Sequence, residues 1–139
     1  MNTFKLVILA AEKAFYEGDC LSLVIPTTQG QYGIQAMHVN MIAAIVPGML
    51  KFTTPDGEEI VAAVSEGLVK VENNHVLLLV DTAEKPEEID ENRAKRAAAQ
   101  AKEAILQKHS IQDYQLAQAK MARAINRLKV KKYHNNVNN

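Results

Sequence analysis

Two arginine-bearing stretches in the last third of this 139-residue chain carry the residue types best suited to binding an anion. The first reads Ile89-Asp90-Glu91-Asn92-Arg93-Ala94, and the second contains Arg123 and Arg127. Residues three or four positions apart share a face of a helix, so each stretch presents its charges together. If both stretches are helical and run antiparallel, Arg93, Arg123 and Arg127 converge at the open end of the hairpin and outnumber Asp90. Guanidinium groups bind phosphates bidentately, so polyphosphate is the natural occupant of such a site. The alternative is a solvated arginine face with ion pairs inside each helix.

The sequence contains no recognisable catalytic or metal-binding pattern. The four histidines lack metal-ligand spacing, Cys20 has no identified base beside it, and no glycine-rich phosphate loop occurs. We therefore expect no catalytic site, no metal site and no enzyme activity. His38 is predicted to be a structural hydrogen-bonding residue rather than a ligand, and Cys20 a small apolar strand residue.

Charge divides the chain into two parts. The chain is formally neutral, with 16 basic and 16 acidic residues, yet residues 1–84 carry 4 Lys against 10 Asp plus Glu and residues 85–139 carry 12 Lys plus Arg against 6. The two parts thus have net charges of −6 and +6, which indicates different partners or mutual neutralisation. The single cysteine excludes a disulfide scaffold, and no apolar run is long enough to span a bilayer. We expect neither a signal peptide nor direct membrane insertion.

The first part has the pattern of short strands separated by turns. Apolar runs at spacings of about ten residues, with Pro, Gly and Asn between them, are typical of a β-sandwich or barrel. The predicted strands are residues 4–10, 21–25, 41–46, 49–53, 59–64, 68–71 and 76–80. The sequences Asp56-Gly57 and Asn73-Asn74 are expected at hairpin tips, where residues with positive φ are needed.

The second part has helical periodicity. Alanines recur at three- and four-residue steps after Pro86, with Thr82 or Asp90 as the candidate cap of the first helix. A break at residues 109–113 offers Ser110 or Asp113 as the cap of a second helix. We predict an α-helical hairpin over residues 85–133 and a disordered tail over 134–139. Because a buried alanine methyl contributes only about 0.8 kcal/mol, the hairpin is either mobile or a permanently packed alanine coil.

A basic helical region also suits nucleic acid. The stripe of Arg93, Arg96, Lys102, Arg123 and Arg127 could neutralise phosphates, although aromatic residues are few and no base-reading motif is present. A free-standing nucleic-acid-binding module is therefore the alternative function.

Several short motifs together resemble one family. They are Gly30-Gln-Tyr-Gly33-Ile34 with His38 nearby, Pro47-Gly48-Met-Leu50, Asp56-Gly57, Glu66-Gly67, Leu79-Val-Asp81-Thr-Ala-Glu84, Ile89-Asp90-x-x-Arg93-Ala94 and Arg123-Ala-Ile-Asn-Arg127-Leu128-x-Val130. In order and spacing, over residues 3–132, the chain resembles the epsilon subunit of bacterial F-type ATP synthase. It departs from the family's usual pattern at Gln35-Ala-Met-His38 and Ser65-Glu-Gly67.

The resemblance implies an all-β sandwich followed by an α-helical hairpin, acting as a non-catalytic subunit of the central stalk. The sandwich would bind the gamma subunit and the c-ring, and so couple proton flow to ATP synthesis. The subunit would lie peripherally at the cytoplasmic face of the cell membrane and would have no nucleic-acid partner. The hairpin would inhibit ATP hydrolysis by extending toward the alpha and beta subunits. The basic residues that would meet the beta subunits are Arg93, Arg96, Lys102, Lys120, Arg123 and Arg127.

The resemblance also implies a regulatory ATP site, although no cofactor is required. Carried over, its residues are Glu84, Ile89, Asp90, Arg93, Ala94, Arg123 and Arg127. ATP-binding members usually have a further arginine where this chain has Gln100. A lost charge-assisted contact costs roughly 1.5–3 kcal/mol, so ATP binding is expected to be weakened or absent.

Overall fold

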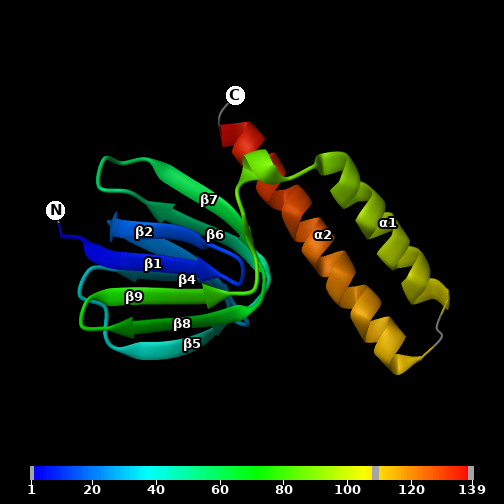
Figure 1. Ribbon diagram of the computed structural model, residues 1–139, viewed down its shortest axis with the longest axis horizontal. Coiled ribbons are helices and arrows are strands. Elements are labelled where there is room, and N and C mark those ends of the chain that lie inside the picture. Colours follow the sequence, from blue (N-terminus) through cyan, green and yellow to red (C-terminus); the bar gives the residue numbers. More distant parts are fainter. Residues whose placement is uncertain (1, 108–109, 138–139) are drawn as a thin grey trace. The chain divides into compact units, whose positions relative to one another are not determined.

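The computed structural model describes residues 2–107 and 110–137. The chain forms two compact units, Met1–Glu84 and Lys85–Asn139. Within the described residues the first unit consists of strands and the second of helices (Figure 1). No helix in those residues is both long and apolar enough to cross a membrane. The predicted architecture, an all-β sandwich followed by an α-helical hairpin, is confirmed.

The first unit is a sandwich of two sheets. One sheet has the strand order β2-β1-β9-β8-β5 and the other β10-β7-β6-β3-β4. The strands are β1 (Phe4–Ala10), β2 (Ala14–Cys20), β3 (Ser22–Thr27), β4 (Gly30–Gln35), β5 (Met41–Ile45), β6 (Gly48–Thr53), β7 (Glu59–Val64), β8 (Gly67–Glu72), β9 (His75–Val80) and β10 (Ala83–Glu84). Neighbouring strands are antiparallel except for β1 and β9, which are parallel.

The core forms between the inner faces of the two sheets. Along β1, Phe4, Leu6 and Ile8 are buried at alternate positions, as the period of a strand requires. Leu50 and Phe52 do the same along β6 in the other sheet. Each fully buried Leu, Ile or Phe contributes about 1.5–3 kcal/mol, so this core holds the sandwich together.

Three strands, β2, β4 and the two-residue β10, were missed by the sequence prediction, and all three lie at the edge of a sheet. Of the residues of β4 only Ile34 is buried, and of those of β2 only Cys20. An edge strand has one neighbour and buries few side chains, so polar residues can interrupt its apolar pattern, as they do in β2 and β4. The edge strand β5 was predicted because all five of its residues are apolar. All seven predicted strands are confirmed, with ends that differ by a few residues.

Turn geometry explains the residues that connect the strands. Gly57 has φ of +87°, and Asn73 and Asn74 have φ of +51° and +64° at the β8–β9 hairpin tip. These are the conformations predicted for the two hairpin tips. Gly67 has a different role, because an added Cβ would overlap the carbonyl oxygen of Leu79 on the paired strand.

The second unit contains a short 3-10 helix, η1 (Pro86–Glu88), and two α-helices, α1 (Glu91–Gln107) and α2 (Ile111–Val137). Ser110 caps α2, because its Oγ accepts a hydrogen bond from the N–H of Asp113 at 3.0 Å. The prediction that the chain is disordered from residue 134 is wrong for residues 134–137, which continue α2. Residues 138–139 lie outside the described residues. The helix persists because its last turns make contacts with η1 that a sequence pattern does not show.

The two α-helices pack against each other side by side (Figure 1). Their buried alanines are Ala94 and Ala101 on α1 and Ala117 and Ala124 on α2. Ala101 and Ala117 lie equally far from the turn, and so do Ala94 and Ala124, so in an antiparallel hairpin each pair is opposite. Alanines seven residues apart on both helices allow the axes to approach closely.

Candidate functional site

The open end of the hairpin is organised around Asp90. The backbone oxygen of Asp90 accepts the N–H of Ala94 at 3.0 Å, and its Oδ1 accepts the N–H of Arg93 at 3.1 Å. Asp90 is therefore the N-cap of α1, one of the two caps that the sequence offered. Its negative charge also lies at the positive end of the helix dipole. This carboxylate has a structural role whether or not a ligand binds.

The apolar members of the motif are buried beside the cap. Ile89 is 5% exposed and Ala94 is 4% exposed. Their places in the motif are thus explained by packing within the protein. Asp90 and Arg93 between them are exposed, so only the polar members of the motif face solvent.

The hairpin register determines which basic residues lie at the same level. With Ala94 opposite Ala124, Arg93 lies at the level of Ile125, between Arg123 and Arg127. Helical periodicity of 3.6 residues per turn then directs Asp90 and the three arginines to the same side of the hairpin. The backbone register therefore favours their convergence, which stays a prediction. Arg93 is exposed, and Arg123 and Arg127 are partly buried.

The other predicted residues occupy different places. Glu84 belongs to β10 of the sandwich unit, where it pairs with Ala63, whereas the remaining residues of the ATP motif belong to the helical unit. Arg96, Lys102 and Lys120 are exposed on the helices. Gln100 lies two turns beyond Arg93, about 10 Å along the helix axis, on the same side of α1.

Contacts that the sequence analysis missed hold the end of α2 to η1. The Nζ of Lys131 donates a hydrogen bond to the carbonyl oxygen of Pro86 at 2.9 Å. The Nε2 of His134 lies 3.6 Å from Oε1 of Glu87. The 27-residue α2 is longer than the 17-residue α1, and its extra turns reach the segment that precedes α1. The only sequence signal was the uninterrupted run without Gly or Pro after Ser110.

The sandwich has a second candidate surface, on the outer face of the sheet that contains β1, β9, β8 and β5. Leu9, Leu79 and Leu68 pair directly across three strands, and the row continues to Ala14 on β2 and Ala44 on β5. These three leucines are 36%, 46% and 52% exposed. The adjacent row includes Ile42, which is 71% exposed. A continuous exposed apolar area of this kind marks an interaction surface.

His38 and Cys20 behave as the sequence predicted. The Nδ1 of His38 lies 2.7 Å from the carbonyl oxygen of Val39, to which it donates, so Nε2 accepts from the hydroxyl of Tyr32 at 2.7 Å. His38 is thus a hydrogen-bonding residue, and it also lines an open pocket of about 560 Å³ over the paired strands β3 and β4. Burial raises the pKa of the Cys20 thiol, which donates a hydrogen bond to the carbonyl oxygen of Ser22. A protonated, buried thiol is inert rather than reactive.

Among residues 2–107 and 110–137, no three His, Cys, Asp or Glu side chains are grouped as a metal ion would require.

Comparison with known proteins places both units in one family. Residues 3–86 match the family model described as ATP synthase, Delta/Epsilon chain, beta-sandwich domain, and residues 87–132 match the ATP synthase, Delta/Epsilon chain, long alpha-helix domain. An ATP synthase epsilon chain from Shouchella clausii is 35% identical over 133 residues, which cover 96% of this chain and 98% of the relative. The epsilon chain from Clostridium novyi is 40% identical over 129 residues, covering 93% and 98%.

Solved structures share the fold. A chain of the Euglena gracilis mitochondrial ATP synthase, in a structure of OSCP/F1/c-ring, has a TM-score of 0.81 at 18% identity, with 89% of this chain and 78% of that chain covered. A chain of the Tetrahymena thermophila mitochondrial ATP synthase central stalk/c-ring has a TM-score of 0.63 at 12% identity, with 91% and 95% covered. At these identities the likeness concerns the fold alone.

Proposed function

Because the chain belongs to the ATP synthase delta/epsilon family, as a relative of bacterial epsilon chains, we propose that it acts in the central stalk of an F-type ATP synthase. There it binds the gamma subunit and the c-ring and couples proton flow to ATP synthesis. The family predicted from the sequence is confirmed, and with it the assignment to a non-catalytic subunit. Family membership also favours this function over the alternative of a nucleic-acid-binding module.

The exposed apolar face of the sandwich carries the proposal. Leu9, Leu79, Leu68 and Ile42 lie on one sheet face and remain partly or largely exposed. A free-standing protein gains nothing from such a face, whereas a stalk subunit buries it against its neighbour. The gamma subunit is the proposed occupant. If the chain occupies this place in the stalk, it also contacts the c-ring and lies peripherally at the cytoplasmic face of the cell membrane.

Gamma binding is tested with variants of that face. Leu68→Asp places a charge in the centre of the proposed interface and should weaken binding of purified gamma subunit by at least about a hundredfold, as loss of a central contact does. Gln31→Asp introduces the same charge at an exposed position of β4, in the other sheet, and is the matched control. Equal affinity of the Leu68→Asp variant and the unaltered chain for gamma would refute the assignment of this face.

We also propose that the hairpin inhibits ATP hydrolysis through its basic residues. Arg93, Arg96, Lys102 and Lys120 are exposed, and the helical unit has a net charge of +6. Such a surface complements acidic segments of the beta subunits and would bind less well at high salt. Removal of residues 85–139 tests this in the reconstituted complex. An unchanged hydrolysis rate would refute the inhibitory role of the hairpin, while the proposal that the sandwich binds gamma would still stand.

ATP is proposed only as a weak regulatory ligand of the hairpin. The register that brings Arg93, Arg123 and Arg127 to one side supports an anion site, while Gln100 on that side lacks the charge for a further phosphate contact. Gln100→Arg should then raise ATP affinity about ten- to a hundredfold, the value of one charge-assisted hydrogen bond. Calorimetric titration of the full chain with ATP measures this, and submicromolar affinity of the unaltered chain would contradict the weakening attributed to Gln100.

A further inference from the structure

The loop between β4 and β5 presents apolar side chains from a backbone conformation that needs support. Met37 and Val39 are each 74% exposed, although both are apolar. Met37 also has φ of +64°, in the left-handed region that residues with a side chain seldom adopt. Packing of the sandwich does not account for this conformation, because the Met37 side chain is not in the core. The conformation instead holds an apolar side chain outward.

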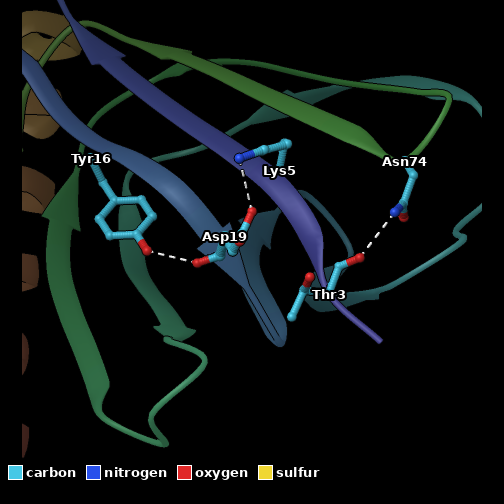
Figure 2. Close-up of polar contacts among 5 residues, drawn as sticks. All are labelled: Thr3, Lys5, Tyr16, Asp19 and Asn74. Carbon is cyan, nitrogen blue, oxygen red and sulfur yellow. Dashed lines mark hydrogen bonds and ion pairs between the residues drawn. The ribbon is translucent and has the colours of Figure 1, made fainter. Parts of the chain in front are cut away.

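Asn74 holds this loop in place. Its Oδ1 accepts a hydrogen bond from the N–H of Met37 at 2.7 Å, and its Nδ2 donates to the carbonyl oxygen of Thr3 at 3.0 Å. Figure 2 shows the second of these bonds, from the β8–β9 hairpin tip to the segment before β1. One side-chain amide therefore ties together three segments that are distant in the sequence.

Two further contacts restrain the same loop. Asn40 accepts a hydrogen bond from the N–H of Asn73 through its Oδ1 at 3.0 Å. The ring of His38 is bonded on one side to the hydroxyl of Tyr32 and on the other to the carbonyl oxygen of Val39. The loop is thus fixed from the hairpin tip and from β4. Such preorganisation lowers the ordering cost when a partner binds.

We propose that Asn74 is a positioning residue for gamma-subunit binding, which it supports by holding Met37 and Val39 outward in the loop that leads to Ile42. The inference rests on the proposed function. The loop leads directly into β5, so Val39 lies three residues before Ile42 of the apolar sheet face, whereas the row of Leu9, Leu79 and Leu68 lies toward the other end of the sheet. Asn74 itself need not touch the partner.

The test measures the affinity of the full chain for purified gamma subunit. Asn74→Gly removes both side-chain bonds and leaves the positive φ of the turn unstrained, because glycine adopts that conformation freely. Asn73→Gly is the matched control, since Asn73 also has positive φ and contributes only backbone groups to the contacts described above. We expect Asn74→Gly to weaken binding about three- to tenfold, the effect of losing a preorganised contact, and Asn73→Gly to change it less than about twofold.

A double-mutant cycle separates positioning from a general loss of stability. Met37→Ala should weaken gamma binding about tenfold through lost apolar contact. Asn74→Gly should weaken the Met37→Ala variant little further, because both changes remove the contact that the Met37 side chain makes with gamma. Asn74→Asp keeps the acceptor for the Met37 N–H and should retain most of the affinity even if Asn74→Gly folds poorly. Additive effects in the cycle, or equal affinities of the Asn74→Gly and Asn73→Gly variants, would overturn the positioning role. Failure of the unaltered chain to bind gamma would instead refute the proposed function.

Discussion

Replacement of Asp90 by alanine tests whether this carboxylate is a helix cap, a ligand or both. The change removes the Oδ1 that accepts the N–H of Arg93 at 3.1 Å. Loss of an N-cap costs about 1 kcal/mol, and loss of a negative charge at the helix N-terminus costs a further ~0.3–1 kcal/mol. We therefore expect Asp90→Ala to destabilise the first turn of α1 by about 1–2 kcal/mol.

The assay is amide hydrogen exchange on the full chain, followed at Arg93 and Ala94. A loss of about 1–2 kcal/mol corresponds to roughly a 5- to 30-fold increase in the opening of the first turn. Asp90→Ser keeps a capping oxygen and should recover most of the protection, since serine caps about as well as aspartate. Glu103→Gln, an exposed change within α1, is the control for altered charge.

The same variants distinguish the cap from a ligand to ATP. If Asp90 only caps the helix, Asp90→Ser retains whatever ATP affinity the unaltered chain has. If its carboxylate contacts the nucleotide, Asp90→Ser and Asp90→Ala lose affinity alike. Unchanged exchange at Arg93 in the Asp90→Ala variant would refute the capping argument, because the hydrogen bond would then have no energetic weight.

Three further predictions concern the two units. Gly67→Ala forces a Cβ against the backbone of β9 and should destabilise the sandwich by about 3 kcal/mol or more in urea unfolding. Gly33→Ala is the control: its added Cβ meets no atom within 4 Å, so stability should change by less than about 0.5 kcal/mol. Lys131→Met removes the hydrogen bond to η1 and should destabilise the end of α2 by about 0.5–1.5 kcal/mol by hydrogen exchange, with the exposed Lys132→Met as control; equal effects would contradict the contact. Burial raises the pKa of the Cys20 thiol above its ordinary value of 9.0, so the folded state favours the protonated thiol. The contribution of this thiol to the free energy of unfolding is full below pH 9 and is lost as pH rises through the folded-state pKa. Cys20→Ala should therefore flatten the loss of stability at alkaline pH in unfolding experiments.

Local interactions made much of this protein predictable. Strands β1, β6, β8 and β9 bury alternate side chains and β7 buries a continuous apolar run, so their patterns survive in the sequence, whereas β2 and β4 each bury one side chain and produce none. The caps Asp90 and Ser110 act on amides three residues ahead, which is why short motifs reveal them. The candidate anion site could be predicted to the level of its residue types for the same reason, as spacing along a helix is a local property.

The fold class, the two helices and the side of each helix on which the charges lie could therefore be predicted from the order of the residues. Contacts between distant groups became known from the folded chain: Lys131 with the carbonyl of Pro86, Asn74 with Thr3 and Met37, and the row of leucines across β1, β9 and β8. These contacts could not be predicted because the groups that make them are far apart in the sequence. Periodicity and capping depend on neighbours three or four residues away, whereas these contacts depend on strand order and register, which many weak interactions across the whole unit establish together.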